Sequence, residues 1–214
     1  SRTSQNGQRS KRESTRKEET AYIAASSENR LDTWILWELA IVTNTIDTDL
    51  SGYDITHASR QIASFLENLT NWYIRRSRRR FWKSDSDADK ASAYATLYTV
   101  LTQFCIIAAP FMPIVTEYIW KVLTGDAVDN SVHLQDYPSI SLTANTTLAD
   151  AMNYAQIIVR MWLASRGKKN IRVRQPLSLL TLGVQLEQYY LDIIAEELNI
   201  KKVLCDSSLN SHVT

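Results

Sequence analysis

Apolar residues recur every three or four positions through most of this chain, and this spacing restricts the fold more than any other feature. The first stripe consists of Leu31, Ile35, Leu39, Val42 and Ile46. These residues share one face of a helix, because an α-helix turns by about 100° per residue. Gly and Pro number only 5 and 4 among 214 residues. The pattern therefore predicts long helices rather than a turn-rich β-sandwich.

Three more stripes predict three more helices. Their apolar positions are Ala58, Ile62, Phe65, Leu66, Leu69, Trp72 and Tyr73, then Tyr94, Leu97, Leu101, Phe104 and Cys105, then Val115, Tyr118, Ile119 and Val122. Asn29 and Asp54 are expected to cap the first two helices, and no helix breaker interrupts the second before Lys83. Pro113 suits the first turn of the fourth helix and Gly125 its end. Short connections between amphipathic helices predict an antiparallel bundle over residues 29–145.

The pattern changes beyond residue 145. A fifth helix is expected from a cap at Thr147 to Gly167, followed by an alternating strand at 171–174. Another strand is expected within 177–182, a helix around 190–198 and a short strand at 202–204. Residues 146–214 therefore predict a small α+β module, so the fold class is mainly α, a helical bundle followed by this module.

Residues 1–28 are polar and of low complexity. Such a segment buries too little apolar surface to offset the entropy cost of ordering, so it is interpreted as a disordered linker. Its basic residues leave an RNA-binding tail as an alternative. The chain begins with Ser1 instead of Met, which suggests a piece of a longer protein.

Several classes of function find no support in the sequence. Three scattered histidines and two distant cysteines lack metal-ligand spacing, and no Gly-rich phosphate loop is present. We therefore predict no catalytic residues and no metal site. No apolar run reaches the roughly 20 residues of a membrane span, and the cysteines fit a reducing, cytoplasmic compartment. The net charge of +1 means that any attraction to nucleic acid must be local.

The most unusual segment runs from Asn71 to Trp82 and contains five arginines within six residues. They are Arg75, Arg76, Arg78, Arg79 and Arg80. Like charges three and four positions apart repel on a helix, so the segment calls for an anion. Arginine binds phosphate through paired donors, and aromatic rings stack on unpaired bases. The segment, including Trp82, predicts an RNA-binding site.

A structural interpretation competes for part of this segment. Continuing the apolar stripe places Arg76 and Arg80 on the inward face, where they could pair with acids. The candidate acids are Glu67, Asp32 and Glu117. Trp72 is expected to belong to the core rather than to a base platform. Arg75, Arg78 and Arg79 are thus the preferred RNA contacts, and a helical scaffold with an arginine ion-pair hub remains an alternative.

A second basic cluster follows the fifth predicted helix. Its candidate RNA-binding residues are Lys168, Lys169, Arg172 and Arg174. In the expected strand, Ile171 and Val173 would face a core while the two arginines face solvent. This second cluster is expected to contact phosphate only if it lies on the same side of the molecule as the arginines of the segment Asn71–Trp82.

The run Asn71–Trp82 resembles a signature of the isoleucyl-tRNA synthetases, a family of class I aminoacyl-tRNA synthetases. Other ordered stretches agree with that family over roughly residues 29–205. They are Leu31–Leu36, Ala109–Pro113, Ser131–Pro138, Ile171–Leu177 and Glu196–Lys201. The arginine run distinguishes this resemblance from one to the valyl or leucyl enzymes.

The resemblance implies an anticodon-binding region whose partner is tRNA(Ile). The complete enzymes of that family attach isoleucine to tRNA in translation, using ATP and Mg²⁺ on a catalytic domain. The catalytic signatures and the editing domain are absent from this chain, so the resemblance implies no cofactor here and a missing catalytic domain as partner. A free-standing RNA-binding or regulatory paralogue is the alternative.

Overall fold

A computed structural model describes residues 29–83, 86–125, 127, 130–138 and 146–206 of the chain. The predicted disordered linker at 1–28 lies outside these residues. The chain divides into two compact units, Ser1–Ala144 and Asn145–Thr214, which we describe separately.

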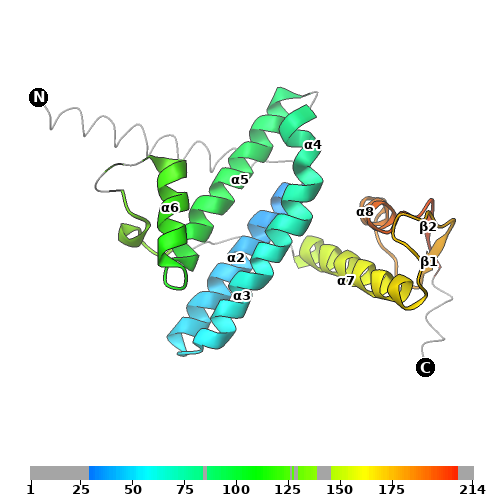
Figure 1. Ribbon diagram of the computed structural model, residues 1–214, viewed down its shortest axis with the longest axis horizontal. Helices are drawn as coiled ribbons and strands as arrows, with labels where there is room; N and C mark the ends of the chain where they lie inside the picture. The colour runs from blue at the N-terminus through cyan, green and yellow to red at the C-terminus, as the bar shows by residue number, and fades with distance from the viewer. Residues whose placement is uncertain (1–28, 84–85, 126, 128–129, 139–145, 207–214) are drawn as a thin grey trace, which may run out of the picture. The chain divides into compact units, whose positions relative to one another are not determined.

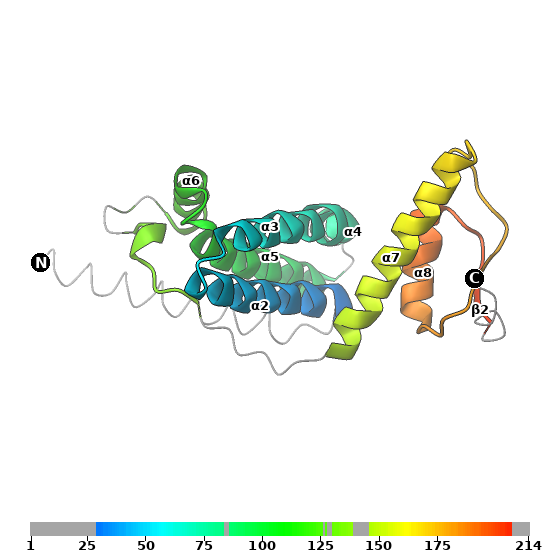
Figure 2. The same cartoon turned by 90° about the horizontal axis from the view of Figure 1, so that it is seen from below.

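The first unit is a bundle of helices that run side by side in antiparallel order (Figures 1 and 2). In chain order its helical elements are α2 (Arg30–Ser51), α3 (Ile55–Glu67), η1 (Asn68–Ile74), α4 (Arg75–Lys83), α5 (Asp87–Ala108), α6 (Pro113–Thr124) and the short η2 (Val132–Leu134). Helix α2 packs against α3 and α5, while α5 also packs against α4 and α6. The predicted antiparallel helical bundle is confirmed.

Local signals in the sequence account for where these helices begin and end. The side chain of Asn29 accepts a hydrogen bond from the amide of Leu31 (3.0 Å), and Asp54 accepts one from His57 (2.9 Å). Both predicted caps are therefore confirmed. At the break between α2 and α3, Tyr53 rather than Gly52 adopts the left-handed conformation, with φ of 60°.

The second predicted helix is continuous, because α3, η1 and α4 follow one another without a break and span roughly 40 Å at 1.5 Å per residue. Its middle segment η1 is a π-helix. The buried positions explain this: Phe65, Leu69, Tyr73, Ser77 and Phe81 are each four residues apart. Four such steps leave an α-helix about 160° out of phase. A π turn closes hydrogen bonds five residues apart and so keeps these residues on one face.

Helix α5 is the central helix of the bundle, and its inward face matches the predicted one only at Phe104 and Cys105, which are buried. The buried line runs through Ala93, Thr96, Val100, Phe104 and Ile107, whereas Tyr94 is exposed. The predicted apolar positions cover only one side of this helix, whereas α5 packs against α2, α4 and α6 on several sides. By length and composition α5 could span a membrane, but half of its most apolar window is buried in the bundle.

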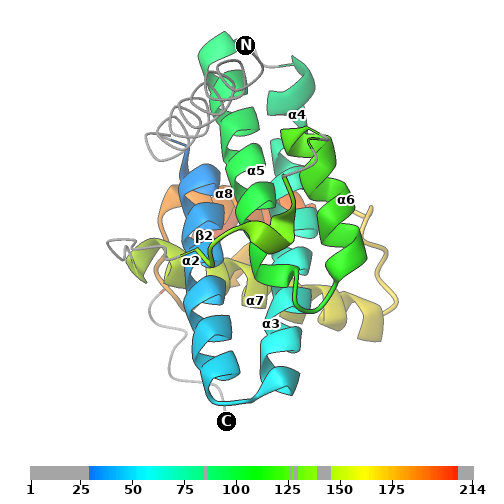
Figure 3. The same ribbon diagram turned by 90° about the vertical axis from the view of Figure 1, so that its left-hand side faces the viewer.

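Helix α6 lies beside α5 (Figure 3), and the face that it buries differs from the predicted one. Thr116 and Trp120 are its buried residues, and the indole N–H of Trp120 donates to Asn130 (3.0 Å). The predicted stripe is wrong here, because Val115, Tyr118 and Val122 are exposed. The large aromatic side chain, with a hydrogen-bond acceptor near its polar end, occupies the interior instead.

The second unit is a small α+β module, as predicted. Its elements are α7 (Thr146–Lys168), β1 (Leu180–Leu182), α8 (Gln188–Leu198) and β2 (Val203–Cys205). Helices α7 and α8 pack together, and the two strands are parallel, with Leu180 opposite Val203. A helix between two parallel strands is the usual crossover connection. Helix α7 begins one residue before Thr147, so the predicted cap lies inside the helix.

The strand predicted at 171–174 is absent, since this described segment forms a turn after α7. Asn170 adopts the left-handed conformation (φ 55°), and the amide of Ile171 donates back to Arg166 (2.9 Å). This is a helix-terminating motif in which Asn is tolerated. Val173 is therefore exposed rather than inward-facing.

Candidate nucleic-acid interface

The outward face of α4 gathers most of the predicted RNA-binding side chains. At 100° per residue, Arg78, Trp82, Arg75 and Arg79 fall within an arc of about 100°. All four are exposed, and Trp82 exposes 71% of its surface. The opposite side of α4 carries the buried Ser77 and Phe81. We call Arg75, Arg78, Arg79 and Trp82 the α4 basic face.

The side chains of this face differ in their partners. No carboxylate of the described residues forms an ion pair with Arg78 or Arg79. The Arg78 guanidinium lies 5.7 Å from the ring centre of Trp82, and Arg75 donates to the carbonyl of Asn71 (2.7 Å). The face thus offers a dense positive charge beside an accessible indole ring.

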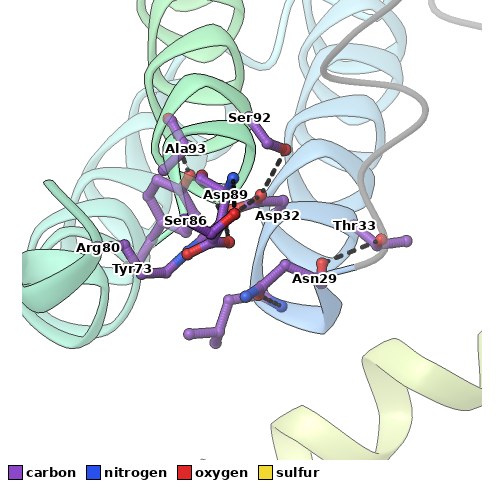
Figure 4. A network of polar contacts seen from close by, with 10 residues as sticks. Asn29, Asp32, Thr33, Tyr73, Arg80, Ser86, Asp89, Ser92 and Ala93 are labelled. Atoms are coloured by element: carbon purple, nitrogen blue, oxygen red, sulfur yellow. Dashed lines mark hydrogen bonds and ion pairs between the residues drawn. The ribbon is translucent and has the colours of Figure 1, made fainter. Parts of the chain in front are cut away.

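Arg80 behaves differently from these residues, because it points into the bundle and binds two carboxylates (Figure 4). Its Nη1 and Nη2 atoms donate to the two oxygens of Asp32 at 2.6 and 2.8 Å. Its Nε atom donates to Asp89 at 2.9 Å. The hydroxyl of Tyr73 donates to Asp32 (2.8 Å), and that of Ser92 does so at 3.3 Å. We call Asp32, Arg80 and Asp89 the carboxylate clamp.

The Asp32–Arg80 pair of the clamp is largely buried, so each of its charged groups is stabilised by the oppositely charged group beside it. Asp32 is fully buried, and the Arg80 side chain is 12% exposed. Burial disfavours the guanidinium charge, but hydrogen bonds to Asp32 and Asp89 outweigh it and raise the pKa of Arg80. Burial, reinforced by the nearby Asp32 charge, also raises the pKa of Tyr73, so its hydroxyl stays a donor.

The structure thus separates the five arginines into different environments. The predicted pairing of Arg80 with Asp32 is confirmed, and Arg76 is half-buried between the two faces. Glu117 instead accepts hydrogen bonds from Ser131 and Val132, both at 2.9 Å. Sequence reasoning missed Asp89. The signal was its place a few residues beyond Lys83, in the first turn of α5, which packs back against α4.

Trp72 lies in the core, as predicted, with 9% of its surface exposed. It belongs to the buried side of the helix together with Leu69 and Tyr73. Its indole ring is therefore unavailable as a platform for bases, which leaves Trp82 as the accessible tryptophan of the arginine segment.

The second basic cluster lies in the other unit, around the end of α7. Lys168, Lys169, Arg172 and Arg174 are all exposed. Arg166 precedes them but is buried, with 3% of its surface exposed. Its guanidinium donates to the carbonyls of Arg172, Gln175 and Leu198 at 3.0, 3.0 and 2.6 Å. It therefore holds the module together, while the other four remain predicted RNA contacts.

Among the residues that the structure describes, no group of three or more His, Cys, Asp or Glu side chains could hold a metal ion. The chemistry that the described surface supports is recognition of a polyanion.

Comparison with known proteins gives this surface a context. The family described as the anticodon-binding domain of tRNA ligase matches residues 32–181, which include the carboxylate clamp and the α4 basic face. The chain is 42% identical over 193 residues to an isoleucine–tRNA ligase of Clostridium novyi (strain NT), covering 87% of this chain and 18% of the relative.

Further relatives agree with this match. An isoleucine–tRNA ligase of Clostridium kluyveri is 39% identical over 192 residues (87% of this chain, 19% of the relative), and one of Treponema denticola is 40% identical over 187 (84% and 17%). The chain thus spans less than a fifth of the length of these curated relatives. Since the family match covers most of the helical bundle and reaches into the second unit, the chain belongs to the anticodon-binding domain family of tRNA ligases.

Proposed function

We propose that the chain is the tRNA-binding part of an isoleucine–tRNA ligase and holds the anticodon stem and loop of tRNA(Ile). The observation that carries the proposal is the α4 basic face, where three exposed arginines and an exposed tryptophan share one side of a helix. Guanidinium groups bind phosphates, and an indole ring can stack on an unpaired base of the loop.

Within this proposal the five arginines have different roles. Arg75, Arg78 and Arg79 contact the tRNA backbone, and Trp82 stacks on a base. Arg76 contributes charge at the edge of the face. Arg80 was also predicted to bind tRNA, but its donors are already directed at Asp32 and Asp89, so we assign it to the protein interior instead. Lys168, Lys169, Arg172 and Arg174 supply further phosphate contacts.

The complete ligase would work in the cytoplasm with a catalytic domain that the relatives' greater length leaves room for. ATP and Mg²⁺ would act on that domain, and the steps that we assign to this chain use neither. A free-standing paralogue without catalysis remains the second possibility. Coding sequence for a catalytic domain immediately upstream would favour the ligase, and its absence would favour the paralogue.

Binding of isoleucine tRNA to the full chain tests the proposal, with two single variants of equal charge. Arg79→Ala removes an exposed arginine from the α4 basic face, whereas Arg60→Ala removes an exposed arginine from α3. Filter binding in moderate salt should show roughly three- to tenfold weaker binding for Arg79→Ala and little change for Arg60→Ala.

Equal effects of both variants would reject the assignment of this face. Weak, nonspecific retention of tRNA by the unaltered chain would favour the alternative of a helical scaffold. In such a scaffold the arginines would pair with acids of a partner protein.

A further inference from the structure

The carboxylate clamp joins the basic helix α4 to two other helices through a single side chain (Figure 4). Asp32 is the third residue of α2, and Asp89 lies in the first turn of α5. All three nitrogens of the Arg80 guanidinium are engaged: Nη1 and Nη2 with Asp32, Nε and Nη2 with Asp89. Because this group is a rigid plane, two carboxylates bound to different edges define its orientation.

Holding Arg80 inward also decides where the α4 basic face points. Arg80 lies about 140° around the helix from Arg75, so a helix with Arg80 directed into the bundle turns Arg75, Arg78 and Arg79 toward solvent. The other contacts of this helix face are less directional. Phe81 packs against Tyr94 with ring centres 5.2 Å apart, and such a contact tolerates rotation better than the clamp does.

The composition of α4 explains why such a restraint is useful. Its nine residues include five arginines and Lys83, with no acidic residue among them. Repulsion between like charges at three and four positions favours fraying of this helix. The clamp opposes that tendency near the end of α4.

We propose that Asp32 and Asp89 are positioning residues for tRNA binding, which act through Arg80 to hold the α4 basic face in its binding orientation. This inference rests on the proposed function. Neither aspartate contacts the RNA, and both carry the charge that a polyanion repels. The two aspartates are therefore expected to strengthen tRNA binding, whereas their negative charge alone predicts that they weaken it.

That opposition in sign gives a sharp test with a matched control. Asp89→Ala and Asp87→Ala each remove one negative charge from the first turn of α5, but Asp87 is exposed and forms no ion pair with any described residue. Charge alone predicts that both variants bind isoleucine tRNA more tightly. The clamp predicts that Asp87→Ala binds as well or more tightly, whereas Asp89→Ala binds about threefold or more weakly.

Hydrogen exchange of the α4 amides, measured without RNA, provides a readout that does not depend on tRNA binding. Exchange over residues 75–82 should accelerate in Asp89→Ala and stay unchanged in Asp87→Ala. Asp89→Glu, which keeps a carboxylate in reach of Arg80, should restore both the exchange rates and the tRNA affinity toward those of the unaltered chain. Thermal unfolding of each variant identifies any global loss of structure.

The outcomes separate this inference from the proposed function. Tighter tRNA binding by Asp89→Ala, equal to that of Asp87→Ala, or unchanged α4 exchange in Asp89→Ala would overturn the inference while leaving the proposed function intact. An unaltered chain without salt-dependent tRNA binding would overturn the proposed function and the positioning role together. In that case faster α4 exchange in Asp89→Ala would still establish the clamp as part of the fold.

Discussion

The guanidinium group of Arg166 is buried in the second unit, where backbone carbonyls rather than carboxylates accept its hydrogen bonds. One of these carbonyls belongs to Leu198, the last residue of α8, at 2.6 Å. Carbonyls at the C-terminus of a helix lack intrahelical partners and carry partial negative charge. The end of α8 therefore offsets part of the cost of burying a cation.

This arrangement predicts that Arg166→Lys destabilises the second unit by about 2 to 3 kcal/mol, because an ammonium cannot reach three separate carbonyls as a planar guanidinium does. Arg160→Lys makes the same change at an exposed position of α7 and should be neutral. Urea unfolding followed by circular dichroism measures both. Equal midpoints for the two variants would contradict a structural role for Arg166.

At this scale the sequence predicts some side-chain environments and not others. Helical spacing alone places Arg80 and Trp72 inward, since both continue the apolar stripe. Spacing could not show that Arg166 is buried, because the carbonyls that accept its N–H groups come from segments as distant in sequence as Leu198. Contacts between elements depend on how the chain folds back, and one helix's pattern does not contain that information.

The π-helix η1 lies directly before the α4 basic face in the chain. Its first residue, Asn68, donates from its side-chain amide to Glu38 of α2 (3.2 Å). Glu38 exposes only 9% of its surface, and burial raises its pKa above the ordinary 4.5 despite the hydrogen bond from Asn68. The folded chain thus holds the Glu38 proton more tightly than the unfolded chain does.

The direction of this shift predicts the pH dependence of stability. The folded state binds more protons than the unfolded state. The contribution of Glu38 to the free energy of unfolding therefore falls as the pH rises from the ordinary pKa of this carboxyl through its raised pKa. Glu38→Gln keeps an acceptor for Asn68 without a titrating group. The variant should therefore gain stability relative to the unaltered chain between acidic and neutral pH, as measured by urea midpoints across that range. If the urea midpoints of the variant and the unaltered chain differed by the same amount at every pH, the raised pKa of Glu38 would be contradicted.

The elements also show where periodicity is ambiguous. Four-residue steps from Phe65 to Phe81 contained the signal for a widened helical turn, although they looked like an ordinary stripe. In α6 the sequence contains two apolar faces, and the one with the buried Trp120 packs inward. The alternation at 171–174 finds no partner strand among the residues that the structure describes. Two-residue periodicity over so short a segment is insufficient to predict a strand.

Over the whole molecule, the small net charge conceals a strong local concentration of positive charge on α4. The chain carries a net charge of +1, yet three exposed arginines lie on one side of α4. Long-range attraction of tRNA is therefore expected to be weak, and under the proposed function the affinity comes from direct phosphate contacts, chiefly at this face. Such contacts release counterions from the RNA, so their number appears in the salt dependence of binding.

That dependence is the most direct test of the account. For the unaltered chain, three to five phosphate contacts predict a plot of log K against log salt concentration with a slope of about −2 to −4 for isoleucine tRNA. Replacing Arg75, Arg78 and Arg79 together with Ala should make the slope shallower by about 2 to 3 units. An unchanged slope in this triple variant, with the fold intact by circular dichroism, would show that tRNA binds elsewhere.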